Sequence, residues 1–332
     1  MPAAQTLQMI TSLWVSQSLG AVARLGIPDQ IANQPKTSQE IAKAVGADSD
    51  AVHRLLRALA SIGVFRQVDG DRFGLTTLGE TLRSNVQGSV RDFAIAETDP
   101  GHWQPWGRMH DCIKTGRPAT KAALGMEFWE WYAKNPQDAV AFSSAMGNLS
   151  QMVASELPQV VDFSKVQKVV DVGGAHGVLL AAILRSNPSV RGILFDLPHV
   201  AETAKPVIDA QGLGNRCEVI GGDFFKKIPD GGDAHVLKHI IHDWDDERAT
   251  LILKNCHRAL RPSGRVLLVE MIIPADNSPS PTQFMDLNML VLLGGRERSE
   301  AEFATLLRNA GFKTPRLIPT HSPFFVIEAE RG

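Results

Sequence analysis

From residue 166 onward, short apolar strand patterns alternate with amphipathic helix patterns, and this alternation limits the possible folds more than any other feature. Helices are expected at Val178–Arg185, Val200–Gln211 and Glu247–Leu260. Such alternation is typical of a mostly parallel sheet covered by helices. The expected strands are VQKVVDV (166–172), RGILFD (191–196), CEVIGG (217–222), AHVLKH (234–239) and RVLLVEM (265–271), and RLIPTHSPFFVIEAE (316–330) predicts two more strands joined by a turn at His321–Pro323.

The first 91 residues have a different pattern. Helices are expected at Gln5–Leu25, Ser38–Val45 and Ser49–Ile62, and VFRQVDGDRFGLT (64–76) predicts two strands that turn at Asp69-Gly70. Three helices followed by a hairpin predict a winged-helix-like domain at 1–91. Residues 92–158 are helical and aromatic, and we expect them to form the connector and substrate-pocket segment of a second domain spanning 92–332.

The first strand of the second domain leads into a glycine-rich turn at 173–177 and then into a helix. This order places backbone N–H groups and a helix N-terminus at the carboxyl edge of the sheet, where a nucleotide-like ligand is expected. The dinucleotide fingerprint G-x-G-x-x-G is not met from Gly173, because Ala175 and Val178 occupy its other two glycine positions. NAD is therefore disfavoured.

The next two strands end in acidic residues. Asp196 follows the second strand, where a carboxylate can accept hydrogen bonds from both hydroxyls of a ribose. Asp223 and Phe224 follow the third strand and offer an acid and an apolar face to an adenine ring. Structural alternatives exist, since the turn can be a plain strand–helix connection, Asp196 can cap the next helix, and Phe224 can be a core residue. The order of all three features favours an adenosyl site.

Six segments together resemble the plant-type and bacterial small-molecule O-methyltransferases, a family that includes phenylpropanoid, polyketide and N-acetylserotonin methylating enzymes. The likeness covers nearly the whole chain and implies an α/β fold: a Rossmann-like, seven-stranded class I methyltransferase domain with an N-terminal, mostly helical dimerisation domain. The segments are VVDVGGAHG (169–177), ILFDLPHV (193–200), GGDFF (221–225), LKHIIHDWDDE (237–247), RVLLVE (265–270) and GGRERSEAEF (294–303).

The resemblance also implies a co-substrate, S-adenosylmethionine, and a homodimer. It implies that Ser150 lies near the amino-acid end of the co-substrate and Lys238 near its adenine end. The other implied contacts are Gly173, Asp196, Asp223 and Phe224. One position departs from the family, because Ala175 stands where glycine is usual. Alanine can adopt ordinary φ/ψ values, so we expect binding to survive this change.

A base is expected after the fourth strand. Methyl transfer from a sulfonium is an in-line displacement, and a phenol of pKa about 10 needs a base with a pKa near the working pH. His242 matches the base position of the family. We interpret the other histidines nearby, His235, His239 and His176, as structural residues.

Two acids stand at places where the family's acids flank and orient the histidine. They are Glu270, at the end of the fifth strand, and Glu297. A carboxylate near the imidazole holds one tautomer and favours the imidazolium. Glu297 can alternatively be a charge at a helix N-terminus. Asp243 is expected to orient the co-substrate or to cap the following helix.

By family position, Phe142 and Met146 line an apolar acceptor pocket, although a buried helix face shows the same spacing. Asp286 and Asn288 invite comparison with the divalent-metal site of catechol-type methyltransferases. That site needs several converging oxygen ligands, and no second acidic cluster accompanies this pair. We therefore expect no metal.

Composition narrows the remaining functions. The net charge is −2, and the segment from Thr37 to Ser84 carries six basic and six acidic residues, so nucleic acid is not expected as a partner. Apolar runs stay below the roughly 18 residues of a membrane span, and no signal-peptide pattern or disulfide spacing is apparent, which predicts a cytoplasmic protein without membrane partners.

Two rival functions remain. The first is a winged-helix regulator that binds DNA and senses a small ligand, although the charge balance disfavours it. The second is decarboxylation or hydroxylation by a methyltransferase-like enzyme. The set of His242, Glu270 and Glu297 favours methylation, because those reactions need no base against a phenol. Accumulation of S-adenosylhomocysteine during turnover would discriminate between them.

Overall fold

The computed structural model describes residues 1–276 and 278–332. Contacts divide the chain into two compact units. The first contains Met1–Trp103 and Trp129–Asn148, and the second contains Gln104–Phe128 and Leu149–Gly332. Because Trp129–Asn148 returns to the first unit, the chain crosses between the units more than once. The domain boundary expected at residues 91 and 92 stays a prediction.

The second unit is built on a mostly parallel sheet, as expected. Across the described ranges, seven strands lie in the order β6-β5-β4-β7-β8-β10-β9. The five strands β4 to β8 are parallel to one another, whereas β10 is antiparallel to both β8 and β9. The bounds are β4 (Lys168–Val172), β5 (Arg191–Asp196), β6 (Cys217–Gly221), β7 (Gly232–Lys238), β8 (Leu260–Glu270), β9 (Arg316–Pro319) and β10 (Phe325–Glu330).

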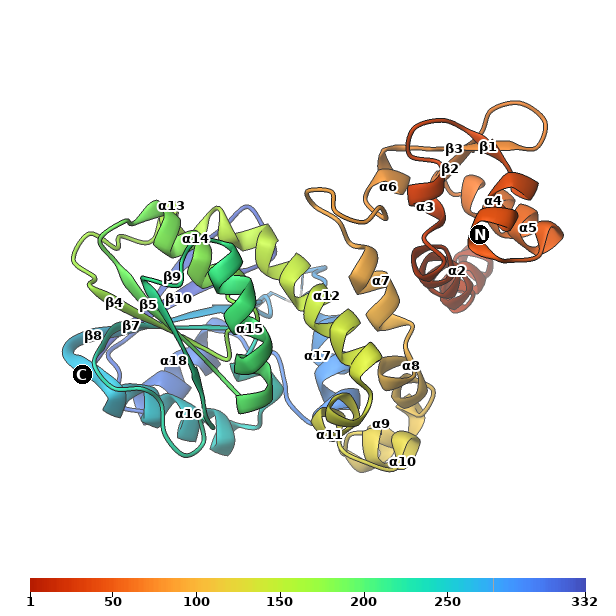
Figure 1. The fold of residues 1–332 in the computed structure, drawn as a ribbon. Helices are drawn as coiled ribbons and strands as arrows, with labels where there is room; N and C mark the ends of the chain where they lie inside the picture. Colours follow the sequence, from red (N-terminus) through yellow and green to blue (C-terminus); the bar gives the residue numbers. More distant parts are fainter. Residues whose placement is uncertain (277) are drawn as a thin grey trace. The chain divides into compact units, whose positions relative to one another are not determined.

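Helices cover both faces of this sheet (Figure 1). Along β4, Val169 belongs to the core that α14 (Val178–Ser186) and α15 (Pro198–Ala210) close, and Val170 belongs to the core under α16 (Asp246–Ala259) and α18 (Glu300–Asn309). The alternation of side chains along a strand produces this two-sided burial. Each fully buried aliphatic side chain contributes roughly 1.5–3 kcal/mol relative to exposure. The two cores therefore fix the sheet edge on which the site is built.

That edge is where the carboxyl ends of the parallel strands meet. The chain continues from β4 to β5 and β6 on one side, and then passes to β7 and β8 on the other. The strand order therefore reverses between β4 and β7, which is where ligands bind in open α/β sheets. The loops after β4, β5, β7 and β8 all begin at this edge.

In the first unit, a three-stranded antiparallel sheet with the order β1-β3-β2 packs with short helices. Strands β2 (Phe65–Gln67) and β3 (Arg72–Leu75) flank the expected turn, where Gly70 has a φ of 52°. A short strand β1 (Lys36–Thr37) was not expected. The helices of this region are α1 (Pro2–Ile10), α2 (Ser12–Arg24), α3 (Ile27–Gln30), α4 (Ser38–Val45), α5 (Ser49–Ala60) and α6 (Thr77–Glu80).

The expected single helix Gln5–Leu25 is wrong, because it is broken at Thr11 into α1 and α2. The Thr11 hydroxyl donates to the carbonyl of Leu7, at 3.0 Å, and the Ser12 hydroxyl donates to that of Met9, at 2.7 Å. The Leu7 carbonyl also accepts the helical bond from the amide of Thr11, at 3.0 Å, so the hydroxyl bond is an additional one. The expected helix is therefore present as two shorter helices on either side of Thr11.

The segment between the two sheets is helical, as expected. None of the helices in the described residues is long and apolar enough to cross a membrane. The bounds are α7 (Arg91–Glu97), α8 (Pro100–Trp106), α9 (Met109–Thr115), α10 (Thr120–Leu124), α11 (Phe128–Lys134), α12 (Pro136–Ala154) and α13 (Leu157–Val160), and α17 (Thr282–Leu292) lies later in the chain.

Candidate active site

The glycine-rich turn after β4 is held against the end of β5. The Gly173 amide donates to the carbonyl of Phe195 at 2.8 Å, and Gly173 has a φ of 73°, a left-handed value that favours glycine. A Cβ at Gly173 would lie 2.4 Å from the Ile240 side chain. Position 173 therefore needs glycine for its backbone conformation and also for the close approach of Ile240.

Ala175 adopts a φ of 48°, so the expectation of ordinary φ/ψ at this position is wrong. The left-handed conformation places Cβ close to the following carbonyl oxygen and costs an L-residue roughly 1–2 kcal/mol. The strain is held in place because the Ala175 amide donates to Asp196 Oδ2 at 2.8 Å. The loop keeps its shape here without the usual glycine.

Asp196 ties two backbone segments together at the end of β5. Its Oδ2 accepts from Ala175, and its Oδ1 accepts from the amide of Leu197 at 2.7 Å. The alternative of a helix cap is not realised, because α15 has Leu197 as its N-cap and no side-chain cap bond. Each carboxylate oxygen can accept a further bond, so the position remains compatible with ribose hydroxyls.

The residues after β6 combine an acid with an aromatic cluster. Asp223 Oδ1 accepts from the amide of Phe225 at 2.9 Å. Phe224 packs edge to face with Phe225 and Trp244, with ring centroids 4.9 and 6.1 Å away. Phe224 is half-buried, so it joins the core of this face and also keeps an accessible part. Both interpretations of Phe224 as core residue and as adenine wall fit this placement.

Buried ionisable groups lie at the ends of β4 and β7. Burial raises the pKa of Asp171 to about 7, and its Oδ2 is buried without a hydrogen-bond partner. Burial lowers the pKa of Lys238 to about 8, opposed by the charges of Glu270, Asp171 and Asp243. Lys238 thus lies among the acids of this edge, and its Nζ is 5.8 Å from the ring centroid of Phe324.

His242 lies in a single helical turn after β7, η1 (Ile241–Asp243), and is buried. Its Nδ1 is 2.6 Å from Glu297 Oε1, and its Nε2 is 3.4 Å from Asp243 Oδ1. Since an ionised carboxylate only accepts, Nδ1 carries the proton that it donates to Glu297. The contact fixes the ring so that Nε2 is the nitrogen left for exchange of a proton.

Glu297 is placed against His242 by backbone contacts on both sides. Its amide donates to Asp286 Oδ1 at 2.8 Å, and the amide of Arg296 donates to the carbonyl of His242 at the same distance. A Cβ at Gly295 would lie 2.1 Å from that carbonyl oxygen, so only glycine fits there. The alternative of a helix-terminal charge is wrong, because α18 begins at Glu300 and Ser299 caps it.

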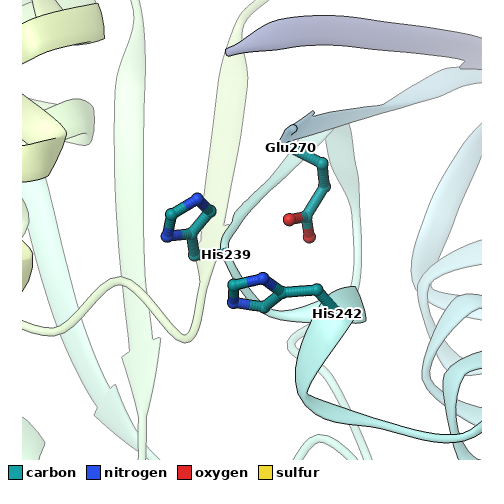
Figure 2. Close-up of side chains that lie close together, drawn as sticks. All are labelled: His239, His242 and Glu270. Atoms are coloured by element: carbon teal, nitrogen blue, oxygen red, sulfur yellow. The ribbon is translucent and has the colours of Figure 1, made fainter. Parts of the chain in front are cut away.

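Glu270 acts on the backbone that carries His242. Its Oε1 accepts from the amides of Ile240 and Ile241, at 3.2 and 2.9 Å, while its Oε2 is buried without a partner. Figure 2 shows its carboxylate directed toward the rings of His239 and His242. Glu270 and Glu297 therefore have different contacts, one with the main chain and one with the imidazole.

Asp243 does not cap the next helix. The N-cap of α16 is Asp245, whose side chain accepts from the amide of Arg248 at 2.8 Å. Asp243 is instead buried beside His242, and burial raises its pKa to about 7. The other expected role, orienting the co-substrate, stays a prediction.

The pKa of His242 is raised to about 10. Burial disfavours the imidazolium, but the charges of Glu297 and Glu270 and the bond at Nδ1 outweigh it. These contacts favour the imidazolium, the state that forms when the histidine takes a proton.

Sequence reasoning missed Arg298, which is buried and contacts the turn that carries His242. Its guanidinium donates to the carbonyls of Ile241 and Trp244, at 3.0 and 2.8 Å, and pairs with Asp246 at 2.8 Å. Arg298 therefore links the turn that carries His242 to the start of α16. The alternation Arg296-Glu297-Arg298 is typical of charged residues exposed to solvent, so the sequence pattern does not predict that Arg298 is buried.

His239 was interpreted as structural, and the structure brings it into contact with His242. Its ring centroid is 4.4 Å from that of His242 and 4.7 Å from that of Phe324. Its φ is 54°, in the left-handed region. His235, by contrast, is fully buried in β7, and His176 lies in the glycine-rich turn.

The expected acceptor residues lie on α12. Phe142 stacks on Tyr132, with centroids 4.7 Å apart, and Met146 follows one turn later in the same unit. Ser150 also lies on α12 but belongs to the second unit. Their roles toward acceptor and co-substrate stay predictions.

The side-chain oxygens of Asp286 and Asn288 accept hydrogen bonds from other residues of the protein. Asp286 accepts from Glu297, and Asn288 Oδ1 accepts from Trp106 Nε1 at 2.7 Å. Both residues thus join α17 to neighbouring segments of the second unit.

The strand order, the glycine-rich turn after β4 and the acid after β5 together define a class I S-adenosylmethionine-dependent methyltransferase. The sequence profile of the O-methyltransferase domain matches residues 106–313, and that of the O-methyltransferase dimerisation domain matches residues 7–85. The chain belongs to this O-methyltransferase family.

Relatives of similar length methylate different atoms. Phenazine O-methyltransferase of Lysobacter antibioticus is 41% identical over 97% of this chain and 94% of its own length. Mitomycin biosynthesis 6-O-methyltransferase of Streptomyces lavendulae is 36% identical over 98% of this chain and 93% of its own. An N,N-dimethyltransferase of Streptomyces davaonensis, named for 8-amino-8-demethylriboflavin, is 34% identical over 98% and 95% of the two chains.

A solved structure supports the same class. Human N-acetylserotonin methyltransferase in complex with S-adenosylmethionine is 25% identical, with a TM-score of 0.92 over 100% of this chain and 98% of that one. S-adenosylmethionine is therefore the co-substrate.

Replacing Ala175 by glycine should stabilise the protein by up to about 1 kcal/mol, because relief of the left-handed strain exceeds the added chain entropy. Urea unfolding measures the difference. As a control of opposite sign, Ala182→Gly inside α14 should destabilise by about 1 kcal/mol. Equal effects at both positions would contradict the strain at Ala175.

Replacing Glu297 by glutamine should lower the pKa of His242, because the substitution removes a buried negative charge at 2.6 Å. A base must be deprotonated to act, so the acidic limb of kcat/KM should move to lower pH, by about one unit or more. The maximal rate should fall. The matched control is Glu300→Gln, an exposed residue that begins α18, and its profile should coincide with that of the native protein. An unmoved limb in Glu297→Gln would exclude His242 as the titrating group.

Proposed function

We propose that the protein transfers the methyl group of S-adenosylmethionine to a hydroxyl group of a small aromatic acceptor and that His242 takes the hydroxyl proton. The observation that carries this proposal is the buried contact between His242 Nδ1 and Glu297 Oε1, at 2.6 Å. The co-substrate supplies an electrophilic methyl group on a sulfonium. What remains for the protein is to position the acceptor oxygen and to stabilise it as an anion.

The proton transfer follows from the contacts of His242. Its Nε2 receives the acceptor proton while Nδ1 stays bonded to Glu297, so the imidazolium forms next to a carboxylate. Glu270 holds the amides of Ile240 and Ile241, which keeps the turn from moving as the charge develops. A phenolate beside the imidazolium of His242 is then the nucleophile.

Several residues remain proposals for binding. We propose that Gly173, Asp196, Asp223, Phe224, Lys238 and Ser150 hold the co-substrate and that Phe142 and Met146 contact the acceptor. The phenazine and mitomycin named for two relatives indicate fused-ring acceptors for this chain as well. We also propose that the reaction needs no metal ion, so that EDTA leaves the rate unchanged, and that the protein acts in the cytoplasm, where its three free cysteines would stay reduced.

Nitrogen is a second candidate acceptor atom, because the flavin relative from Streptomyces davaonensis is an N,N-dimethyltransferase. A neutral amine already has a free electron pair and needs no base before it attacks. Loss of His242 should therefore slow O-methylation much more than N-methylation.

The proposed site can be tested by titrating the protein with S-adenosylhomocysteine in a calorimeter. Asp196→Ala should lose most of the affinity, whereas Asp209→Ala, an exposed carboxylate on α15, should keep it. His242→Ala should bind normally but turn over a phenolic acceptor about 10² to 10⁴ times more slowly. Unchanged turnover would remove His242 from the mechanism. Formation of one S-adenosylhomocysteine per methylated product would exclude decarboxylation and hydroxylation.

We further propose that the protein is a homodimer whose first two helices pack on the partner. Leu7 and Ile10 lie three residues apart on α1, Trp14 lies on α2, and the three residues are 61%, 61% and 65% exposed. Large exposed apolar surfaces of this kind mark interaction sites.

The double substitution Ile10→Glu with Trp14→Glu should convert the dimer to a monomer, since it places two charges in an apolar interface. Sedimentation velocity measures the mass. Leu251→Glu, at an exposed position on α16, is the control and should leave the mass unchanged. A native protein that sediments as a monomer would refute the proposal.

A further inference from the structure

His239 lies beside the base in a strained conformation. It follows β7 with a φ of 54°, and its ring lies over that of His242 at a centroid distance of 4.4 Å and a tilt of 31°. A left-handed backbone is uncommon for residues other than glycine and persists only where the surroundings enforce it. The left-handed turn at His239 therefore brings a second imidazole to the site. The proposed proton transfer assigns no role to this imidazole.

Three buried polar atoms next to His242 lack partners. They are His239 Nε2, Glu270 Oε2 and Glu297 Oε2, on residues that are 8%, 0% and 2% exposed, and none has a hydrogen bond within the described part of the chain. Buried polar atoms are nearly always paired, so such a group at one place points to a missing ligand. The ligand atoms of His239, His242 and Glu270 all lie within 4.8 Å of one another, and Figure 2 shows the three side chains converging.

We propose that His239, His242 and Glu270 bind a divalent transition-metal ion of the zinc class and that the bound ion inhibits methyl transfer. Two imidazole nitrogens and one carboxylate oxygen suit zinc, nickel or copper, whereas magnesium prefers oxygen ligands alone. Zinc lies about 2.0–2.2 Å from such ligands, which places tetrahedral ligand atoms roughly 3.5 Å apart. The three side chains therefore need to close by only about 1 Å.

The contacts around the three residues already resemble the support of a metal site. Glu297 accepts from His242 Nδ1, and a carboxylate bonded to a histidine holds the orientation of its imidazole. Glu270 Oε1 is held by two backbone amides, which leaves Oε2 as its ligand atom. Little rearrangement of the protein is needed for binding.

Inhibition follows because the ion and the acceptor proton compete for the imidazole of His242. A metal ion bound to this ring displaces its proton and opposes the formation of the imidazolium. The binding of metal is independent of the proposed function, whereas the inhibition rests on it. Direct titration and turnover therefore test separate parts of the proposal.

The first experiment is a calorimetric titration of the full-length protein with zinc chloride, with magnesium chloride as the comparison ion. The native protein should bind zinc at one site and should not bind magnesium there. His239→Asn removes one ligand and tolerates the left-handed backbone, so zinc should bind at least about tenfold more weakly. His110→Asn, an exposed histidine on α9, is the matched control and should bind zinc as the native protein does.

A second variant keeps the test decisive if His239→Asn does not fold, as judged by circular dichroism. Glu270→Gln retains an oxygen for the amides of Ile240 and Ile241 but removes the charged ligand, so it too should weaken zinc binding at least about tenfold. Native-like zinc affinity in a folded variant of either kind would overturn the site, as would no binding to the native protein.

The inhibition is measured as methyl transfer at increasing zinc concentration, each protein relative to its own metal-free rate. Zinc should inhibit the native enzyme reversibly, with recovery on addition of EDTA, and His239→Asn should need at least about tenfold more zinc. Equal sensitivity of the two proteins, or stimulation by zinc, would overturn the inhibitory role. If zinc binds at the site but no acceptor is methylated, the proposed function fails and the metal site stands.

Discussion

The buried pair of His242 and Glu297 is the interaction on which the rest of the site depends. A charge pair without water is strongly attractive only when its geometry is held, and here backbone contacts supply that geometry from several sides. Arg296 and Asp286 fix the segment of Glu297, Glu270 fixes the amides before His242, and Arg298 fixes the carbonyls around it. Main-chain atoms at this sheet edge therefore set the position of the His242 imidazole.

The two ends of the site show different ways of using the backbone. At the glycine-rich turn, left-handed residues and a single carboxylate, Asp196, shape a loop that can approach a ligand closely. Around His242, residues that follow β7, end β8 and precede α18 converge, although they are far apart in sequence. The topology alone brings them together, because the carboxyl ends of parallel strands share one edge.

The fold was largely predictable because its signals are local. The strands β4 to β8 are predicted from apolar runs, and the positions of Asp196, Glu270 and His242 after or at strand ends predict that they share one edge. The errors arose where tertiary contacts decide. Ala175 adopts a left-handed conformation in which its amide bonds to the carboxylate of Asp196, and burial and nearby charges together set the pKa of His242. The contact of His239 with His242 depends on the positive φ of His239, which no sequence pattern predicts.

The buried acids of this edge also set a limit on how stable the protein can be. Asp171, Asp243 and Glu270 each have a pKa raised to about 7 by burial, so the folded chain holds their protons to a higher pH than the unfolded chain does. The contribution of these three groups to the free energy of unfolding therefore falls as the pH rises from about 4 toward 7, because they bind more protons in the native state throughout this interval. Selection for heat resistance alone would replace these carboxyls with neutral groups. Their presence in so compact a core indicates that this edge has been shaped by demands other than folding.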